Sequence, residues 1–231
     1  MPKNKKIIFE DLALIDYKKS WEYQEKIFDK IINQKLENRE NNQDKATENH
    51  LLFCQHPHVY TMGKSGSTNN LLFDDNFLKK INARFYKINR GGDVTYHGEG
   101  QLVGYPIIDL ENFDFTIKNY IRNLEEVIIL TLAEYKIKGS RLENSTGVWL
   151  DVGNPFKVRK ICAIGVRASR YVSMHGFALN INTNLDYFNH IIPCGIGNKG
   201  VTSMKNEIGK EINFKEVQDK VYKNFLKVFC L

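Results

Sequence analysis

The chain has 231 residues with 42% hydrophobic side chains, enough for one large domain or two small ones with a buried core. Its net charge of +6, from 33 basic and 27 acidic side chains, favours an acidic partner, but no block of like charge suggests nucleic-acid binding. The far-apart cysteines and the lack of a long apolar run argue against a disulfide framework, a signal peptide and a membrane span, so we predict a cytoplasmic protein.

Three long segments repeat apolar residues at spacings of three and four, which predicts amphipathic helices, and shorter apolar segments predict strands. In chain order, the predicted elements are a helix over 16–37, an exposed loop over 38–49, a buried strand over 51–55, a loop over 56–72, a short helix with an Asp cap over 74–81, a strand over 83–90, a glycine-dense loop over 90–101, a strand over 102–110, a helix over 115–135, β-rich segments over 145–152, 158–169 and 172–182, a short helix or turn over 182–191, and a helix over 213–229. Regular βαβα alternation is missing, so we expect an α+β fold with a mixed or antiparallel sheet and flanking helices, in a single domain over residues 1–231.

The first polar interruption of the strands, QHPHVYTMGK, follows Cys54 and contains His56 and His58. At spacings of two, these three side chains would share one face of a strand and could bind a metal ion. Pro57 interrupts that strand, so we favour histidines that form local hydrogen bonds in a turn, and we predict no metal site.

The second interruption, RGGDVTYHGEGQ, is dense in glycine. Gly91 and Gly92 let the backbone approach a ligand closely, and their amides could cradle an oxyanion. Arg90 and the run Thr95–His97 supply polar side chains beside them. The segment matches neither a P-loop nor a dinucleotide-binding fingerprint, and a plain hairpin loop is the alternative.

Lys160 begins a run that is otherwise apolar, Ile161 to Ile164. Alternation along a strand places Lys160 and Cys162 on one face, with Ile161 and Ala163 on the other. On this pattern alone, Lys160 either extends to the surface or faces a site in which it could transfer protons.

Cys194 lies in a predicted loop, between Pro193 and Gly195, where a ligand could reach it. A nucleophilic thiolate needs a cation or a helix N-terminus nearby, and Lys160 is a candidate for that cation. The residues by themselves leave three possibilities for Cys194: a nucleophile, a metal ligand, or a small apolar residue in a turn.

Four motifs, RGGDVTYHGEGQLVGYPIIDL, KICAIGVR, HGFALNIN and IPCGI…GVTSM, occur in this order. Together they resemble the lipoyl(octanoyl) transferases, the octanoyltransferases of lipoate biosynthesis, from about Leu51 to Met204. One departure is Glu99, because the family usually reads HGPGQ where this chain reads HGEGQ. The resemblance implies a fold like the catalytic domain of biotin and lipoate protein ligases.

The resemblance also implies transfer of an octanoyl or lipoyl group from acyl carrier protein to a lysine of lipoyl domains. These domains belong to the E2 subunits of 2-oxoacid dehydrogenases and to the glycine-cleavage H protein. No cofactor is implied beyond the phosphopantetheine of the donor, and no metal. Cys194 matches the nucleophile that forms an acyl-thioester, and Lys160 matches the lysine that favours its thiolate. The substrate-binding segments match Arg90, Gly91, Gly92, Asp93, Val94, Thr95, Tyr96, His97, Ala163, Ile164, Gly165, Gly176, Phe177 and Ala178.

Three alternatives remain open. An amidotransferase that moves octanoyl between proteins would share the cysteine, and dependence on acyl carrier protein would separate it from the predicted enzyme. An ATP-dependent lipoate-protein ligase would share the fold and a lysine resembling Lys160, but it needs no thiol nucleophile at Cys194. A basic binding module would keep the fold without activity, and the presence of both Cys194 and Lys160 argues against it.

Overall fold

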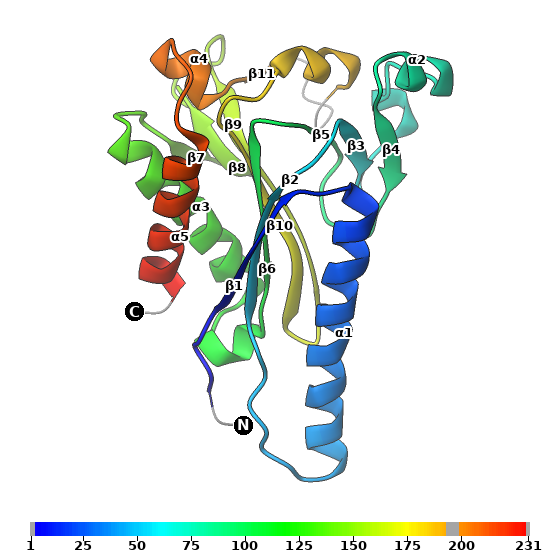
Figure 1. Cartoon of the computed structure of the whole chain (residues 1–231). Coiled ribbons are helices and arrows are strands. Elements are labelled where there is room, and N and C mark those ends of the chain that lie inside the picture. The colour runs from blue at the N-terminus through cyan, green and yellow to red at the C-terminus, as the bar shows by residue number, and fades with distance from the viewer. Residues whose placement is uncertain (1–2, 193–198, 230–231) are drawn as a thin grey trace.

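The computed structural model describes residues 3–192 and 199–229, and its largest element is one twisted sheet (Figure 1). The strands follow the order β1-β2-β6-β10-β9-β8-β7, and β11 pairs with β9. Their bounds are β1 Ile8–Leu14, β2 His50–Gln55, β6 Gln101–Ile107, β7 Ser140–Leu142, β8 Ser145–Leu150, β9 Arg159–Ser169, β10 Val172–Asn180 and β11 Gly200–Val201. The pairs β1–β2 and β9–β11 are parallel and the other pairs are antiparallel, which confirms the predicted mixed sheet.

A second sheet of three short strands lies beside the first, in the order β4-β3-β5. The strands are β3 Val59–Met62, β4 Arg84–Lys87 and β5 Val94–His97. Two of them correct the sequence analysis, because β3 and β5 fall inside the predicted loops 56–72 and 90–101. Both contain β-branched and aromatic residues that pair with each other antiparallel, a long-range contact that local glycine and proline content does not indicate.

Helices cover both faces of the large sheet (Figure 1). Helix α1, Tyr17–Glu40, packs on one face, and α3, Ile117–Glu134, packs with α5, Phe214–Phe229, on the other. The shorter helices are α2 Asp75–Lys80, α4 Met204–Ile208, η1 Thr68–Asn70, η2 Leu110–Phe113 and η3 Leu185–His190. The predicted helices are confirmed, including the Asp74 cap of α2, whose carboxylate accepts a hydrogen bond from the Phe77 amide. Helix α1 runs three residues into the predicted loop. The elements that were not predicted are β1, β7, β11, α4, η1 and η2.

Strand β10 separates two hydrophobic cores, and all of its residues are buried. Phe177 and Leu179 pack into the core that α3 and α5 cover. Met174 and Ala178 pack into the core that α1 covers. Alternation along this strand therefore assigns one set of side chains to each layer of helices. Within residues 3–192 and 199–229, no helix has the length and apolar character that crossing a bilayer needs.

A buried ion pair fastens the far end of α1 to the segment that follows β6. The Lys35 ammonium lies 2.6 Å from the Asp109 carboxylate, and these side chains are only 1% and 3% exposed. Lys35 also contacts Glu111 at 2.7 Å, and the Thr47 hydroxyl donates to the second oxygen of Asp109. Each buried charge is thus compensated, which a low-dielectric environment requires.

We predict that Lys35→Met lowers the free energy of unfolding by about 3–5 kcal/mol, because it leaves the Asp109 carboxylate buried without its counter-charge. Chemical denaturation would measure this loss. The matched control is Lys30→Met on the same helix, where an exposed pair with Glu48 is lost and the change should stay below about 1 kcal/mol. Equal effects of the two substitutions would contradict the prediction.

Candidate active site

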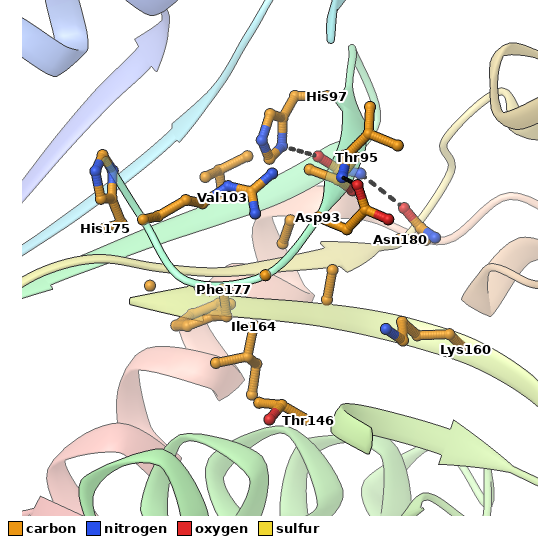
Figure 2. Close-up of a pocket in the computed structure, with 18 of the residues that line it drawn as sticks. Asp93, Thr95, His97, Val103, Thr146, Lys160, Ile164, His175, Phe177 and Asn180 are labelled. Carbon is orange, nitrogen blue, oxygen red and sulfur yellow. Dashed lines mark hydrogen bonds between the residues drawn. The ribbon is translucent and has the colours of Figure 1, made fainter. Parts of the chain in front are cut away.

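A cavity of about 280 Å³ opens between β9, β10 and the small sheet (Figure 2), near the lower end of the size range of small-molecule sites. The predicted site residues that line it are Arg90, Gly92, Asp93, Val94, Thr95, His97, Lys160, Ala163, Ile164, Gly165, Gly176, Phe177 and Ala178. The fold thus brings predicted site residues from three separate stretches of the sequence together around one cavity.

Two predicted residues do not line the cavity, and one cannot be placed. The Gly91 amide donates a hydrogen bond to the Val166 carbonyl, so it is not available to an oxyanion as the glycine pattern suggested. Tyr96 is fully buried on the other side of β5, where its ring stacks on Tyr187. Cys194 lies outside the described residues.

A β-bulge in β9 decides which way Lys160 faces. Val148 pairs with Cys162 while the next residue, Trp149, pairs with Lys160, so Ile161 is an extra residue in β9. Ile161 and Cys162 therefore both pack into the core under α3, and Lys160 lines the cavity together with Ala163. The prediction that strict alternation puts Lys160 and Cys162 on one face was wrong.

Neighbours on β8 accommodate this bulge and hold the lysine. Gly147 has φ +120, and a Cβ there would lie 2.6 Å from the Cys162 carbonyl oxygen, so the position requires glycine. The Lys160 ammonium lies 4.5 Å from the centroid of the Trp149 ring, a cation–π distance. The Thr202 amide donates to the Lys160 carbonyl, which brings the chain that follows the undescribed residues alongside the lysine.

A chain of hydrogen bonds crosses the cavity wall from β5 to β10 (Figure 2). The Gln101 amide donates to Asn180 at 2.9 Å and to the Tyr96 carbonyl, so its oxygen accepts from His97 Nδ1 at 2.8 Å. Asn180 in turn donates to the Thr202 carbonyl. Gln101 and Asn180 were not predicted as site residues, although both lie inside the motifs that carry the family resemblance.

This network holds His97 as a neutral ring with its proton on Nδ1. Burial lowers the pKa of His97 to about 3. Its Nε2 faces the Thr61 hydroxyl at 3.5 Å, and that hydroxyl oxygen accepts a hydrogen bond from Arg90. Arg90, itself buried, also donates to the Thr61 carbonyl at 2.9 Å. At neutral pH the guanidinium therefore carries the charge on this wall, and the imidazole carries none.

A second cluster of rings continues this wall toward α1. The Tyr105 hydroxyl donates to His56 Nε2 at 2.8 Å, and His56 Nδ1 donates to the Ile15 carbonyl. Tyr17 stacks on His97 with ring centroids 5.9 Å apart. His58 instead hydrogen-bonds the Tyr96 hydroxyl. These partners of the two histidines of QHPHVYTMGK are distant in the sequence, which corrects the expectation of local hydrogen bonds in a turn. Tyr17 and Tyr105 line the cavity and were not predicted, although Tyr105 lies inside the first motif that carries the family resemblance.

The comparisons with known proteins agree with this geometry. Residues 16–226 match the family model of the lipoyl protein ligase A/B catalytic domain. Octanoyltransferases of Christiangramia forsetii and Flavobacterium johnsoniae are 57% and 58% identical over 227 residues, which covers 98% of this chain and 97% of each relative.

Solved structures resemble the fold at much lower identity. A lipoate-protein ligase A bound with ATP has a TM-score of 0.67 and 15% identity, and the match covers 99% of this chain and 85% of that one. A biotin protein ligase from Aquifex aeolicus, in complex with biotin and ATP, has a TM-score of 0.51 and 15% identity, with 98% and 71% covered. These matches confirm the predicted likeness to the catalytic domain of lipoate and biotin protein ligases.

The neutral histidines of the wall predict acid sensitivity of the fold. The pKa of His97 in the folded state, about 3, lies below its ordinary value near 6.5, so its stabilising contribution is fully present above pH 6.5 and is lost as the pH falls toward 3. Between pH 6 and 4, we expect His97→Gln to reduce the slope of unfolding free energy against pH by up to about 1.4 kcal/mol per pH unit. Denaturation curves at several pH values would measure it, and identical slopes in the two proteins would contradict it.

Proposed function

The chain belongs to the family of lipoyl protein ligase A/B catalytic domains, and we propose that it transfers an octanoyl or lipoyl group to a lysine of lipoyl domains. The proposed donor is acyl carrier protein, and the proposed acceptors are E2 subunits of 2-oxoacid dehydrogenases and the glycine-cleavage H protein. The observation that carries the proposal is a cavity with apolar walls that reaches the Lys160 side chain, in a chain closely similar to named octanoyltransferases.

The walls of the cavity suit a medium-length acyl chain. Val103, Ile164, Phe177 and Ala178 line the cavity with apolar side chains. Each methylene that leaves water for such a surface contributes about 0.8 kcal/mol to binding. Gly165 and Gly176 pair with each other on β9 and β10. Neither has a side chain that would narrow the cavity at this point.

The chemistry proceeds in two transfers. The Cys194 thiolate attacks the thioester carbonyl of the donor, the bond to the phosphopantetheine sulfur breaks, and that sulfur leaves as a thiol once it takes a proton. A neutral lysine amine of the acceptor then attacks the new thioester, loses a proton, and releases Cys194. An amide is more stable than a thioester, so neither ATP nor a further cofactor is required.

Lys160 supports both transfers in this proposal. In the first transfer its ammonium favours the thiolate form of Cys194 and gives a proton to the leaving phosphopantetheine sulfur. Lys160 is then a neutral amine, which can accept the proton that the attacking lysine loses in the second transfer. The described residues that flank Cys194 end at Ile192 and begin again at Lys199, and Val201 pairs with Lys160. This connection supports Cys194 and Lys160 as partners. The net charge of +6 also favours encounter with acidic protein partners.

We predict that Cys194 carries the acyl group. The protein is mixed with octanoyl acyl carrier protein without ATP, and its intact mass is measured. We expect one octanoyl adduct on the protein without a substitution and none on Cys194→Ala, because a methyl group cannot form a thioester. Hydroxylamine should remove the adduct, and a lipoyl domain should take it up. The matched control, Cys162→Ala, alters a buried core thiol and should keep the adduct.

Two results would reject this function. No adduct and no transfer from a competent donor would rule out the acyltransferase. ATP-dependent modification of the lipoyl domain by Cys194→Ala would instead identify a ligase.

We predict that Lys160→Met lowers kcat/KM for octanoyl transfer by about 10²–10⁴-fold, the range that a positioned proton-transfer group contributes. The Met side chain keeps much of the apolar stem and removes the amine. Lys157→Met is the matched control, since Lys157 is exposed three residues earlier, and its kcat/KM should change little. If the rate at which the acyl adduct forms on Cys194 is lower in Lys160→Met, as measured by rapid quench, the substitution affects the first transfer. Full activity of Lys160→Met would contradict the proposal.

A further inference from the structure

His175, on β10, is an unusual residue in the wall of the cavity. It is 2% exposed, it lines the cavity, and neither of its ring nitrogens has a hydrogen-bond partner among the described residues. Burial lowers its pKa to about 3, with the charges of Arg90 and Arg167 acting in the same direction. The ring is therefore neutral at physiological pH, with one donor and one acceptor available to a ligand.

The backbone at His175 turns away from regular strand geometry. Its φ is +61, a left-handed conformation that is uncommon outside glycine, although Asn, Asp and His adopt it more often than other residues. The pairing of β10 with β6 runs from Asn180 to Phe177 and resumes only at Val172, opposite Asp109. Such strained positions persist where the surrounding structure holds them, and they concentrate at ligand sites.

His175 and Lys160 lie at opposite ends of the cavity view (Figure 2), with Ile164 and Phe177 between them. Gly165 pairs with Gly176, next to His175, and Ile161 is an extra residue in the bulge, so the strand from Lys160 to this end of the cavity spans about 13 Å, or four steps of roughly 3.3 Å. An extended chain advances about 3.5 Å for every three bonds, so an eight-carbon acyl group spans about 8 Å and a twelve-carbon group about 13 Å. For an acyl chain that starts beside Lys160, only the twelve-carbon group is long enough to approach His175.

We propose that His175 is the specificity-determining residue at the inner end of the acyl cavity, where its imidazole hydrogen-bonds a polar atom and so disfavours long, purely apolar acyl chains. This inference rests on the proposed acyl transfer. A chain that stops short of His175 leaves the polar contact intact. A longer hydrocarbon chain displaces the polar atom and buries the imidazole without a partner, whereas a hydroxyl on the last carbon replaces that partner.

The test compares kcat/KM for octanoyl, dodecanoyl and 12-hydroxydodecanoyl acyl carrier protein. With the protein without a substitution, we expect kcat/KM for the octanoyl donor to exceed that for the dodecanoyl donor by about tenfold or more. We expect kcat/KM for the 12-hydroxydodecanoyl donor to be at least about fivefold higher than for the dodecanoyl donor. In His175→Leu, the ratio of dodecanoyl to octanoyl should rise about tenfold and the advantage of the hydroxyl should disappear. His175→Asn, which tolerates the left-handed backbone and keeps a donor and an acceptor, should retain that advantage.

Tyr171→Leu is the matched control, because Tyr171 also has a positive φ in the β9–β10 hairpin but is 52% exposed and outside the cavity. Its acyl preference should equal that of the unmodified protein. If His175→Leu fails to fold, the comparison of the two twelve-carbon donors on the unmodified protein still decides the question. Equal use of these two donors, or an unchanged ratio in His175→Leu, overturns the inference while octanoyl transfer stands. No transfer from any donor would instead reject the proposed function.

Discussion

The pairing of β10 with both β6 and β9 is the constraint on which the rest of the molecule depends. This strand is buried along its whole length, so its backbone amides and carbonyls must find partners in neighbouring strands rather than in water. Once that register is set, Leu179 faces the core under α3 and α5, and Ala178 faces α1 and the cavity. The same pairing thus builds two cores and gives the cavity a wall that does not depend on loop conformation.

The bulge in β9 is a departure from regular pairing that turns Lys160 toward the cavity. A regular strand would direct Lys160 and Cys162 to the same side, and a shift of one residue would exchange core and cavity faces along the strand. With Ile161 as the extra residue, two apolar side chains enter the core in succession, and Lys160 faces the cavity. The price is a glycine at position 147, where no side chain fits against the bulged backbone.

Polarity is distributed unevenly around the cavity. His97 and His56 are neutral, because burial lowers the pKa of each, and both have hydrogen-bond partners that fix their protons. Arg90 carries a permanent charge and donates hydrogen bonds to Thr61 and to the Gly91 carbonyl. These hydrogen bonds hold the polar side chains of the cavity wall in fixed positions. The proposed reaction centre is at the Lys160 end, and the proposed control of acyl length is at the His175 end.

The sequence by itself determined the long helices and the central strands, because periodicities of 3.6 and 2 report which residues face a core, as over 16–37 and 172–182. Its motif set also identified most cavity residues through family resemblance. The short strands β3 and β5, the face of Lys160 and the roles of Gln101, Asn180 and His175 depended on partners far away in the chain. Only the tertiary structure decided these, since hydrogen bonds between distant residues and a one-residue bulge leave no local periodicity. Cys194, outside the described residues, stays a prediction from the sequence.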